Sequence, residues 1–366
     1  MIWLTVRQFR AQAITAAAAL AAFAILLAAT EPHLASMYDS SGLTTCHGDT
    51  CAALASTFLE NLSSGGGFFL IPAASAYAIL YFFSVLVILI APAITGCFWG
   101  APLIARELEA GTFRLTWNQS ITRTRWLTVK LTLVGAAAMA VSEAFSLIQA
   151  WWAAPIGQAV GLGGSASVFS EGRFGWFVFP THGVTPLGYA AFGFALGVTA
   201  GLLVRRPVPA MALTLAIFAA VQFITPLWIR PQLFPTSQAV TTFAAAEANV
   251  SLRVSPKLAV TGGAVPGQPG AWIISAEAVN AAGRPVGIIP AACQSMASQA
   301  LGRHAGDISD QPALNDCVAS QGVQVAESYQ PASHYWPLQW SETGLFLALA
   351  LAMIGYCFWR LNRRRS

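Results

Sequence analysis

Charged residues are scarce in this sequence: Asp, Glu, Lys and Arg make up 9% of its 366 residues, while hydrophobic residues make up 56%. A soluble domain carries about 25% charged residues. Most of the surface of this chain is therefore not expected to face water. The composition indicates a membrane protein that crosses the bilayer several times.

Lysine is nearly absent, and neither lysine belongs to a phosphate-binding loop of the kind that nucleotide-binding proteins use. Neither Lys130 nor Lys257 follows the glycine spacing of the phosphate-binding motif G-x-x-x-x-G-K-[ST]. The sequence also has no H-E-x-x-H, no G-x-S-x-G and no pair of carboxylates at a catalytic spacing. We therefore expect no catalytic residue, no metal site and no cofactor on this chain, and any energy input has to come from a partner.

Long hydrophobic runs are what the sequence does have. About 20 mainly apolar residues suffice for a helix to cross the bilayer core. The lengths of the runs, and the lack of alternation between polar and apolar residues, favour helices over barrel strands. The predicted fold class is an α-helical multi-spanning membrane protein with six transmembrane helices, at about 11–29, 73–101, 127–151, 186–204, 208–228 and 343–359.

The distribution of basic residues predicts the orientation of the spans. Cytoplasmic loops carry an excess of Lys and Arg, and the basic residues here gather in four short segments. Both termini fall on the basic side, so both are predicted to be cytoplasmic in a multi-pass protein of the cell membrane. The segments contain Arg7 and Arg10; Arg106, Arg114, Arg123, Arg125 and Lys130; Arg205 and Arg206; and Arg360, Arg363, Arg364 and Arg365.

The cysteines agree with this topology. Four fall in predicted outside loops, where an oxidising compartment favours disulfides. His47 lies between two of them in "CHGDTC", which leaves a metal site as an alternative, but three ligands without a second cluster suit zinc poorly. The expected disulfide cysteines are Cys46 with Cys51 and Cys293 with Cys317, and Cys97 and Cys357 are expected to stay unpaired.

The first ten residues show helical periodicity. Ile2, Val6 and Phe9 share one face of a helix, with polar residues opposite. We interpret residues 1–10 as an amphipathic helix on the inner membrane surface that leads into the first span. A cleaved secretory signal is the alternative.

Residues 229–340 differ in character from the rest. Apolar runs give way to turn formers, "SLRVSPKLAV" and "AWIISAEAV" alternate as strands do, and "CQSMASQALGRHAG" and "QPALNDCVASQ" look helical. We predict a mixed α/β extracytoplasmic domain here, between the fifth and sixth helices. A second outside segment, 161–186, is rich in Trp and Phe and either lies at the membrane interface or is a plain loop.

The segment "RELEAGTFRLTWNQSITRTRWLTVK", residues 106–130, concentrates charge between the second and third spans. Gly111 is expected to end one helix and Ser120 to cap the next, which gives a cytoplasmic hairpin over 102–126. The general excess of Lys and Arg in cytoplasmic loops is enough to explain the arginines of this hairpin. It does not explain two acids and exposed apolar groups such as Phe113, so we favour a docking surface.

Two further features of the spans have open interpretations. Glu143, with Gln149 further along the third span, is either a polar site of a substrate path or a group that reaches water or a neighbouring helix. Gly193, Gly197 and Gly201 recur every fourth residue, which permits close helix packing, either within the chain or at a dimer seam.

The charged hairpin segment resembles the cytoplasmic loop of ABC-2-type transporter permeases, in particular those of actinobacterial ABC exporters. "GVTPLGYAAFGFALGVTAGLLVRRPVPAMALTL" and "YQPASHYWPLQWSETGLFLALAL" resemble later spans of the same family. The resemblance implies a type V exporter-like arrangement, with spans one to five in 11–228 and the sixth span and a basic tail in 341–366.

The resemblance also implies partners and roles. Residues 1–10 would be the connecting helix, and two ABC ATPase subunits would dock at the hairpin and supply ATP and Mg. A second permease copy would complete a dimer, a homodimer or alternatively a heterodimer, in contact with membrane lipid. The exported, multidrug-type substrate would be a hydrophobic small molecule, lipid or peptide, and no nucleic acid is expected. The implied ATPase-coupling residues are Arg106, Glu107, Glu109, Gly111, Thr112, Phe113 and Arg114.

An alternative function comes from a different class. The chain could be a membrane-anchored extracytoplasmic binding or sensing protein without transport activity. Six spans exceed what an anchor needs, and the chain carries no output domain. The cytoplasmic hairpin discriminates between the two, because only a transporter subunit requires it.

Overall fold

The protein divides into two compact units. Unit 1 comprises Met1–Leu233 and Trp336–Ser366, and unit 2 comprises Phe234–Tyr335. Unit 2 lies within the segment 229–340, for which the sequence predicts a separate domain, and its extracytoplasmic position stays a prediction. The computed structural model describes residues 2–47, 50–64, 75–109, 122–164, 169, 172–242, 250–255, 257–262, 265, 268, 270–303 and 312–363.

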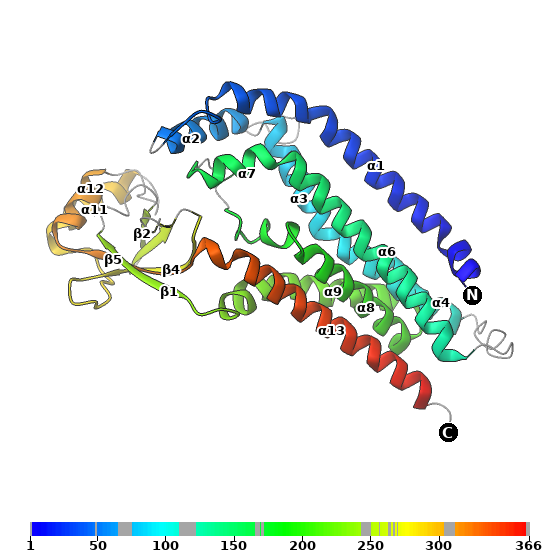
Figure 1. Ribbon diagram of the computed structural model, residues 1–366. Helices are drawn as coiled ribbons and strands as arrows, with labels where there is room; N and C mark the ends of the chain where they lie inside the picture. Colours follow the sequence, from blue (N-terminus) through cyan, green and yellow to red (C-terminus); the bar gives the residue numbers. More distant parts are fainter. Residues whose placement is uncertain are drawn as a thin grey trace. The chain divides into compact units, whose positions relative to one another are not determined.

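Unit 1 is helical. Its long described helices run as a bundle, with the short helices α2 and α7 at one end and α4 at the other (Figure 1). They are α1 (Ile2–Ser40), α2 (Thr50–Ser63), α3 (Ala76–Thr95), the π-helical η1 (Gly96–Gly100), α4 (Ala101–Glu109), α6 (Arg123–Trp152), α7 (Ala154–Gly161), the 3-10 turn η2 (Phe179–Thr181), α8 (Thr185–Val204), α9 (Pro207–Ile224), η3 (Thr225–Ile229), η4 (Arg230–Gln232) and α13 (Tyr335–Arg363).

Six segments of these helices are long and apolar enough to cross a membrane, which confirms the predicted number of spans. The predicted bounds were too short at several ends, because helices continue past the apolar runs. The segments are Arg7–Ser40, Ala76–Arg106, Thr124–Trp152, Thr185–Val204, Pro207–Gln232 and Ala332–Arg363.

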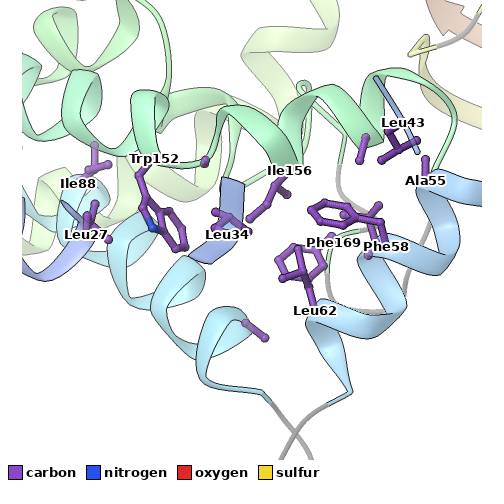
Figure 2. Close-up of a cluster of buried hydrophobic side chains, with 14 of the residues drawn as sticks. Leu27, Leu34, Leu43, Ala55, Phe58, Leu62, Ile88, Trp152, Ile156 and Phe169 are labelled. Atoms are coloured by element: carbon purple, nitrogen blue, oxygen red, sulfur yellow. The ribbon is translucent and has the colours of Figure 1, made fainter. Parts of the chain in front are cut away.

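The first span shows the largest difference. Helix α1 continues to Ser40, beyond the predicted end at residue 29, and α2 and α7 occupy segments that were expected to be loops. Leu34 of α1, Phe58 and Leu62 of α2 and Ile156 of α7 are all buried in one hydrophobic cluster (Figure 2). Burial of a leucine or phenylalanine contributes about 1.5–3 kcal/mol. Tertiary packing therefore extends this helix where local hydropathy is too low to indicate it.

Helix α8 lies at the centre of unit 1 and packs on α3, η1, α4, α6 and α9. Its three spaced glycines face the backbone of the second span. A Cβ added to Gly193 would lie 2.6 Å from the carbonyl oxygen of Pro92, and a Cβ on Gly197 or Gly201 would collide with backbone of η1 or α4. The glycine stripe therefore serves packing within the chain, which decides between the two interpretations left open by the sequence.

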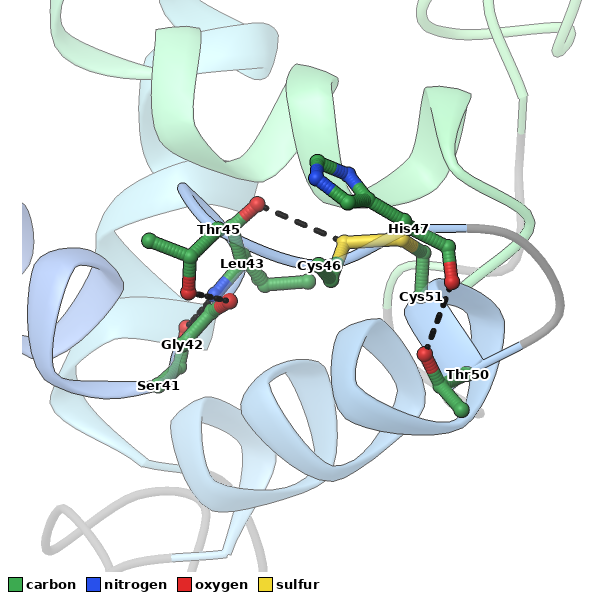
Figure 3. Close-up of a disulfide and its surroundings, with 8 residues drawn as sticks. All are labelled: Ser41, Gly42, Leu43, Thr45, Cys46, His47, Thr50 and Cys51. Atoms are coloured by element: carbon green, nitrogen blue, oxygen red, sulfur yellow. Dashed lines mark hydrogen bonds between the residues drawn. A yellow bond between two sulfur atoms is a disulfide. The ribbon is translucent and has the colours of Figure 1, made fainter.

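The first predicted disulfide is confirmed. Cys46 and Cys51 are bonded, and their Cα atoms are 5.4 Å apart (Figure 3). The Thr50 hydroxyl donates to the carbonyl oxygen of His47 at 3.1 Å, at the start of α2. Both cysteines of "CHGDTC" are therefore in the disulfide, which joins the segment after α1 to the start of α2.

Unit 2 has the mixed α/β character that the sequence predicts. Strands β1 (Ser237–Thr242), β5 (Gln324–Gln330) and β4 (Trp272–Val279) form an antiparallel sheet in the order β1-β5-β4, and β2 (Val250–Ser255) pairs with β3 (Lys257–Gly262). Its two described α-helices are α11 (Gln294–Arg303) and α12 (Pro312–Ser320). The predicted bond between Cys293 and Cys317 is present and joins the residue directly before α11 to α12.

The two remaining cysteines, Cys97 and Cys357, are buried and unpaired, as expected. The described part of the aromatic segment before α8 has both buried and exposed side chains. Phe174 and Phe179 are buried inside unit 1, whereas Phe177 is 45% exposed. Some of its aromatic side chains therefore pack in the core, and a position at the membrane interface stays a prediction.

Candidate functional site

The first candidate site is the end of unit 1 where α1 begins, α4 ends, α6 begins and α13 ends (Figure 1). Helix α4 continues the second span through η1 as far as Glu109. The charged residues Arg106, Glu107 and Glu109 therefore lie on a helix that continues beyond the apolar run. Arg106 and Glu109 are exposed. The side chain of Glu107 is not among the described ones, and Gly111, Thr112, Phe113 and Arg114 lie outside the described residues.

The return helix α6 begins two residues later than the sequence indicated. Thr122 is its N-cap, and the Thr122 hydroxyl accepts a hydrogen bond from the backbone N–H of Arg125 at 3.3 Å. Ser120, the predicted cap, lies outside the described residues. Threonine caps a helix by the same mechanism as serine, so the prediction of a capped, basic helix start is right in kind but wrong in position.

Lys130 is unusual because it is only 3% exposed. Its ammonium lies 4.9 Å from the centroid of the Trp126 ring, in a cation–π contact. Arg106 and Lys130 both line a half-open pocket of about 260 Å³ to which α1, η1, α4 and α6 contribute residues. Basic groups thus lie both on the surface and inside this end of the bundle.

The proposed connecting helix is continuous with the first span. A single helix covers Ile2–Ser40, with no break after residue 10. Phe9 is buried against Trp99, with 4.8 Å between ring centroids in an edge-to-face arrangement. The side chains of Ile2 and Val6 are not among the described ones. That residues 1–10 lie on the membrane surface stays a prediction.

The two polar residues of the third span share a helix but not a face. Glu143 and Gln149 are six residues apart, which at about 100° per residue places them roughly 240° apart around α6. Gln149 is fully buried, and neither atom of its amide has a partner among the described residues. Glu143 is half-buried, and its Oε2 is buried without such a partner. They are separate polar groups.

Sequence reasoning missed a buried ion pair in unit 1. Glu342 accepts two hydrogen bonds from Arg230, 2.9 Å from Nε to Oε2 and 3.2 Å from Nη2 to Oε1. The Tyr189 hydroxyl donates to Oε1 of the same carboxylate at 2.8 Å. The guanidinium carbon lies 4.1 Å from the centroid of the Phe179 ring. Both charged side chains are completely buried.

One helical turn before Glu342, Gln339 completes this cluster. Its Oε1 accepts from the backbone N–H groups of Val184 and Thr185, at 3.1 and 3.2 Å. These N–H groups belong to the start of α8, which has no side-chain cap of its own. Gln339 therefore caps α8 from α13, and the first turns of α13 are bonded to α8.

This cluster lies next to the two chain crossings into unit 2. Arg230 precedes Phe234 by four residues, and Glu342 follows Tyr335 by seven. The pair therefore joins the segment that leaves unit 1 to the segment that returns. The sequence held one signal for it: opposite charges just outside the fifth apolar run and just before the sixth.

A comparison with protein families identifies the helical part. A model described as ABC-2 membrane transporter related matches residues 17–230, which is more than half of the chain. The chain belongs to this family. The match confirms the resemblance seen in the sequence, although the actinobacterial detail stays a prediction. Comparisons with curated proteins and with solved structures return no match.

Family membership decides between the two classes of function. The chain is a multi-pass membrane protein and a permease subunit of an ABC transporter, and the family implies association with an ABC ATPase. The matched region ends at Arg230, so unit 2 lies outside it.

Proposed function

We propose that this permease subunit couples to a separate ABC ATPase through the hairpin between α4 and α6 and exports a hydrophobic substrate. The observation that carries this proposal is the continuous helix from Ala76 to Glu109. It supports a stiff link between the second span and a docking surface, because no loop interrupts it before the acidic residues.

The charge distribution supports the orientation. Arg7, Arg10, Arg106, Arg125 and Arg360 are on helix segments at the same end of unit 1. By the excess of Lys and Arg in cytoplasmic segments, this end and both termini are cytoplasmic. The hairpin then faces the compartment that contains ATP.

The remaining assignments follow from this coupling. Two ATPase subunits bind ATP and Mg, and this chain binds neither. Two permease copies, as a homodimer or with a second permease, enclose the substrate path. ATP-driven closure of the ATPases moves the hairpins and changes which side of the membrane the path faces. The substrate is a hydrophobic small molecule, a lipid or a peptide.

The test is co-purification of the permease with an ABC ATPase encoded beside it, followed by ATP hydrolysis in lipid nanodiscs. Reversing both acids of α4 (Glu107→Arg with Glu109→Arg) should lower the ATPase recovered at least ten-fold, because it reverses the charge that this surface presents to its partner. The matched control is Glu60→Arg on α2, an exposed position at the other end of unit 1.

Retention of the ATPase by the double reversal, at the level of the control, would refute docking through α4. Loss of the ATPase only in the double reversal would support it. Folding of each variant is verified by size-exclusion profile and by the intact Cys46–Cys51 and Cys293–Cys317 bonds.

A further inference from the structure

An apolar groove runs along unit 1 between α6 and α13. It has a volume of about 290 Å³, and its lining residues run from Thr128 to Met139 on α6 and from Leu347 to Phe358 on α13. Ala191 and Phe194 of α8 also line it. On α6, Thr128 and Met139 are 11 positions apart, or about 16 Å at 1.5 Å per residue. The groove is therefore long enough for an extended apolar chain.

The lining offers almost no hydrogen bonding. Among the described residues that line it, only Thr128 and Thr132 have polar side chains. The Thr128 hydroxyl donates to the carbonyl oxygen of Thr124, and that of Thr132 to the carbonyl oxygen of Thr128, both at 2.9 Å. Each hydroxyl proton is thus engaged within α6. A ligand that lies here needs an apolar body.

Small residues, Gly135 and Ala136, line the middle of the groove on α6. A Cβ on Gly135 would lie 3.0 Å from the ring of Phe194, so α6 approaches α8 closely at this point. Ala136 is exposed and lines the groove. A large side chain at Ala136 would therefore fill the groove without entering the core.

Glu143 continues the line of groove residues on α6. It follows Ala136 by seven residues and Met139 by four, and residues with these spacings share one face of a helix. Four residues correspond to about 6 Å along the axis. Glu143 thus lies one turn beyond the described lining, toward the end of α6 that leads into α7.

The carboxyl group of Glu143 is not satisfied by the described residues. Its Oε2 is buried and has no hydrogen-bond partner among them. An ionisable group within a membrane span is costly and marks sites that meet a partner or substrate. A buried acceptor without a donor costs free energy that a ligand with a donor recovers.

We propose that this groove is a binding site for amphipathic amines, with the apolar body between α6 and α13 and the amine at Glu143. An ammonium group supplies both the hydrogen-bond donor and the positive charge that a carboxylate binds best. The site rests on the proposed function, because it names the class of substrate that the permease exports. Neutral lipid chains and a second permease copy are the rival occupants.

The experiment is photo-crosslinking to the permease purified without an ATPase in phosphatidylcholine nanodiscs. Two probes are compared, dodecylamine and dodecanol, each with a diazirine in the alkyl chain. Crosslinked peptides are located by mass spectrometry. The expected result is that dodecylamine labels residues 128–139 and 347–358 in the native protein.

Two variants separate the headgroup from the groove. Glu143→Gln should lower labelling by dodecylamine about ten-fold and leave labelling by dodecanol unchanged. Ala136→Trp should lower labelling by both probes. The matched controls are Glu60→Gln and Ala18→Trp, at exposed positions on α2 and α1, and neither should change the labelling.

Three results would overturn the proposal. Equal labelling of native protein by the two probes would show that only lipid-like chains occupy the groove. Unchanged labelling in Ala136→Trp would place the ligand elsewhere, and crosslinks from the groove to another permease chain would show a dimer interface. Should Glu143→Gln fail to fold, the probe comparison and Ala136→Trp still decide. Because no ATPase is present, these outcomes are independent of docking at α4.

Discussion

Removal of one partner from the buried pair of Arg230 and Glu342 should destabilise unit 1 strongly. Both side chains are completely buried, and the carboxylate accepts from Arg230 twice and from Tyr189 once. Glu342→Gln keeps the size of the side chain and an oxygen for Tyr189, but it leaves the guanidinium charge without a counterion. Loss of one member of a buried ion pair costs about 3–5 kcal/mol. We expect Glu342→Gln to lower the free energy of unfolding by this amount.

A double-mutant cycle measures the interaction itself. Arg230→Met should be destabilising alone, because it leaves the carboxylate with only the Tyr189 hydroxyl. The double variant should be less destabilised than the sum of the single ones, with a coupling energy of about 2 kcal/mol or more. Unfolding is followed in detergent micelles against denaturant. Arg206→Met, at an exposed arginine of the same unit, should change stability by no more than about 0.5 kcal/mol.

A coupling energy below about 0.5 kcal/mol would refute this reasoning. The fold would then depend on the apolar contacts around the pair, and the ion pair would contribute no net stability.

Two further predictions concern packing and pH. Gly197→Ala should destabilise the bundle by about 1–3 kcal/mol, because its Cβ would collide with the Gly96 carbonyl. The control Gly355→Ala on α13 would meet nothing within 4 Å and should be neutral or mildly stabilising. Equal thermal stability of the two variants would contradict this prediction. In unit 2, burial raises the pKa of the Glu327 carboxyl above its ordinary value near 4.3. The folded state therefore binds the proton more tightly than the unfolded state, and stability falls as pH rises from about 4.3 through the folded pKa. Glu327→Gln should remove this slope and stabilise unit 2 at pH 7, as measured by thermal unfolding across a pH series, and an unchanged slope would show that Glu327 is not its cause.

The spans could be predicted because bilayer crossing imposes one strong local requirement, a long apolar run. The two disulfides could be predicted because their cysteines are close in sequence. The extension of α1 to Ser40 could not, because residues 30–40 are too polar to indicate a span and are helical through contacts with α2 and α7. These contacts are visible only once the chain has folded.

The candidate sites likewise divide into features that the sequence shows and features that only the folded chain shows. The charged segment after the second span was visible in the sequence as a local excess of charge. The pair of Arg230 and Glu342 was not, because 112 residues separate its members and each one alone resembles an ordinary charge at the end of a span. The groove beside Glu143 required three helices to be placed together, and no local pattern encodes that placement.

The glycine contacts between α8 and the second span have a mechanical consequence. Where backbone meets backbone, as Gly193 does at Pro92, no side chain can change rotamer to absorb a displacement. We therefore expect a displacement of α4 to move α8 as well, because the backbones of the two helices are in direct contact. Because Ala191 and Phe194 of α8 line the groove between α6 and α13, a displacement of α8 would change the shape of that lining.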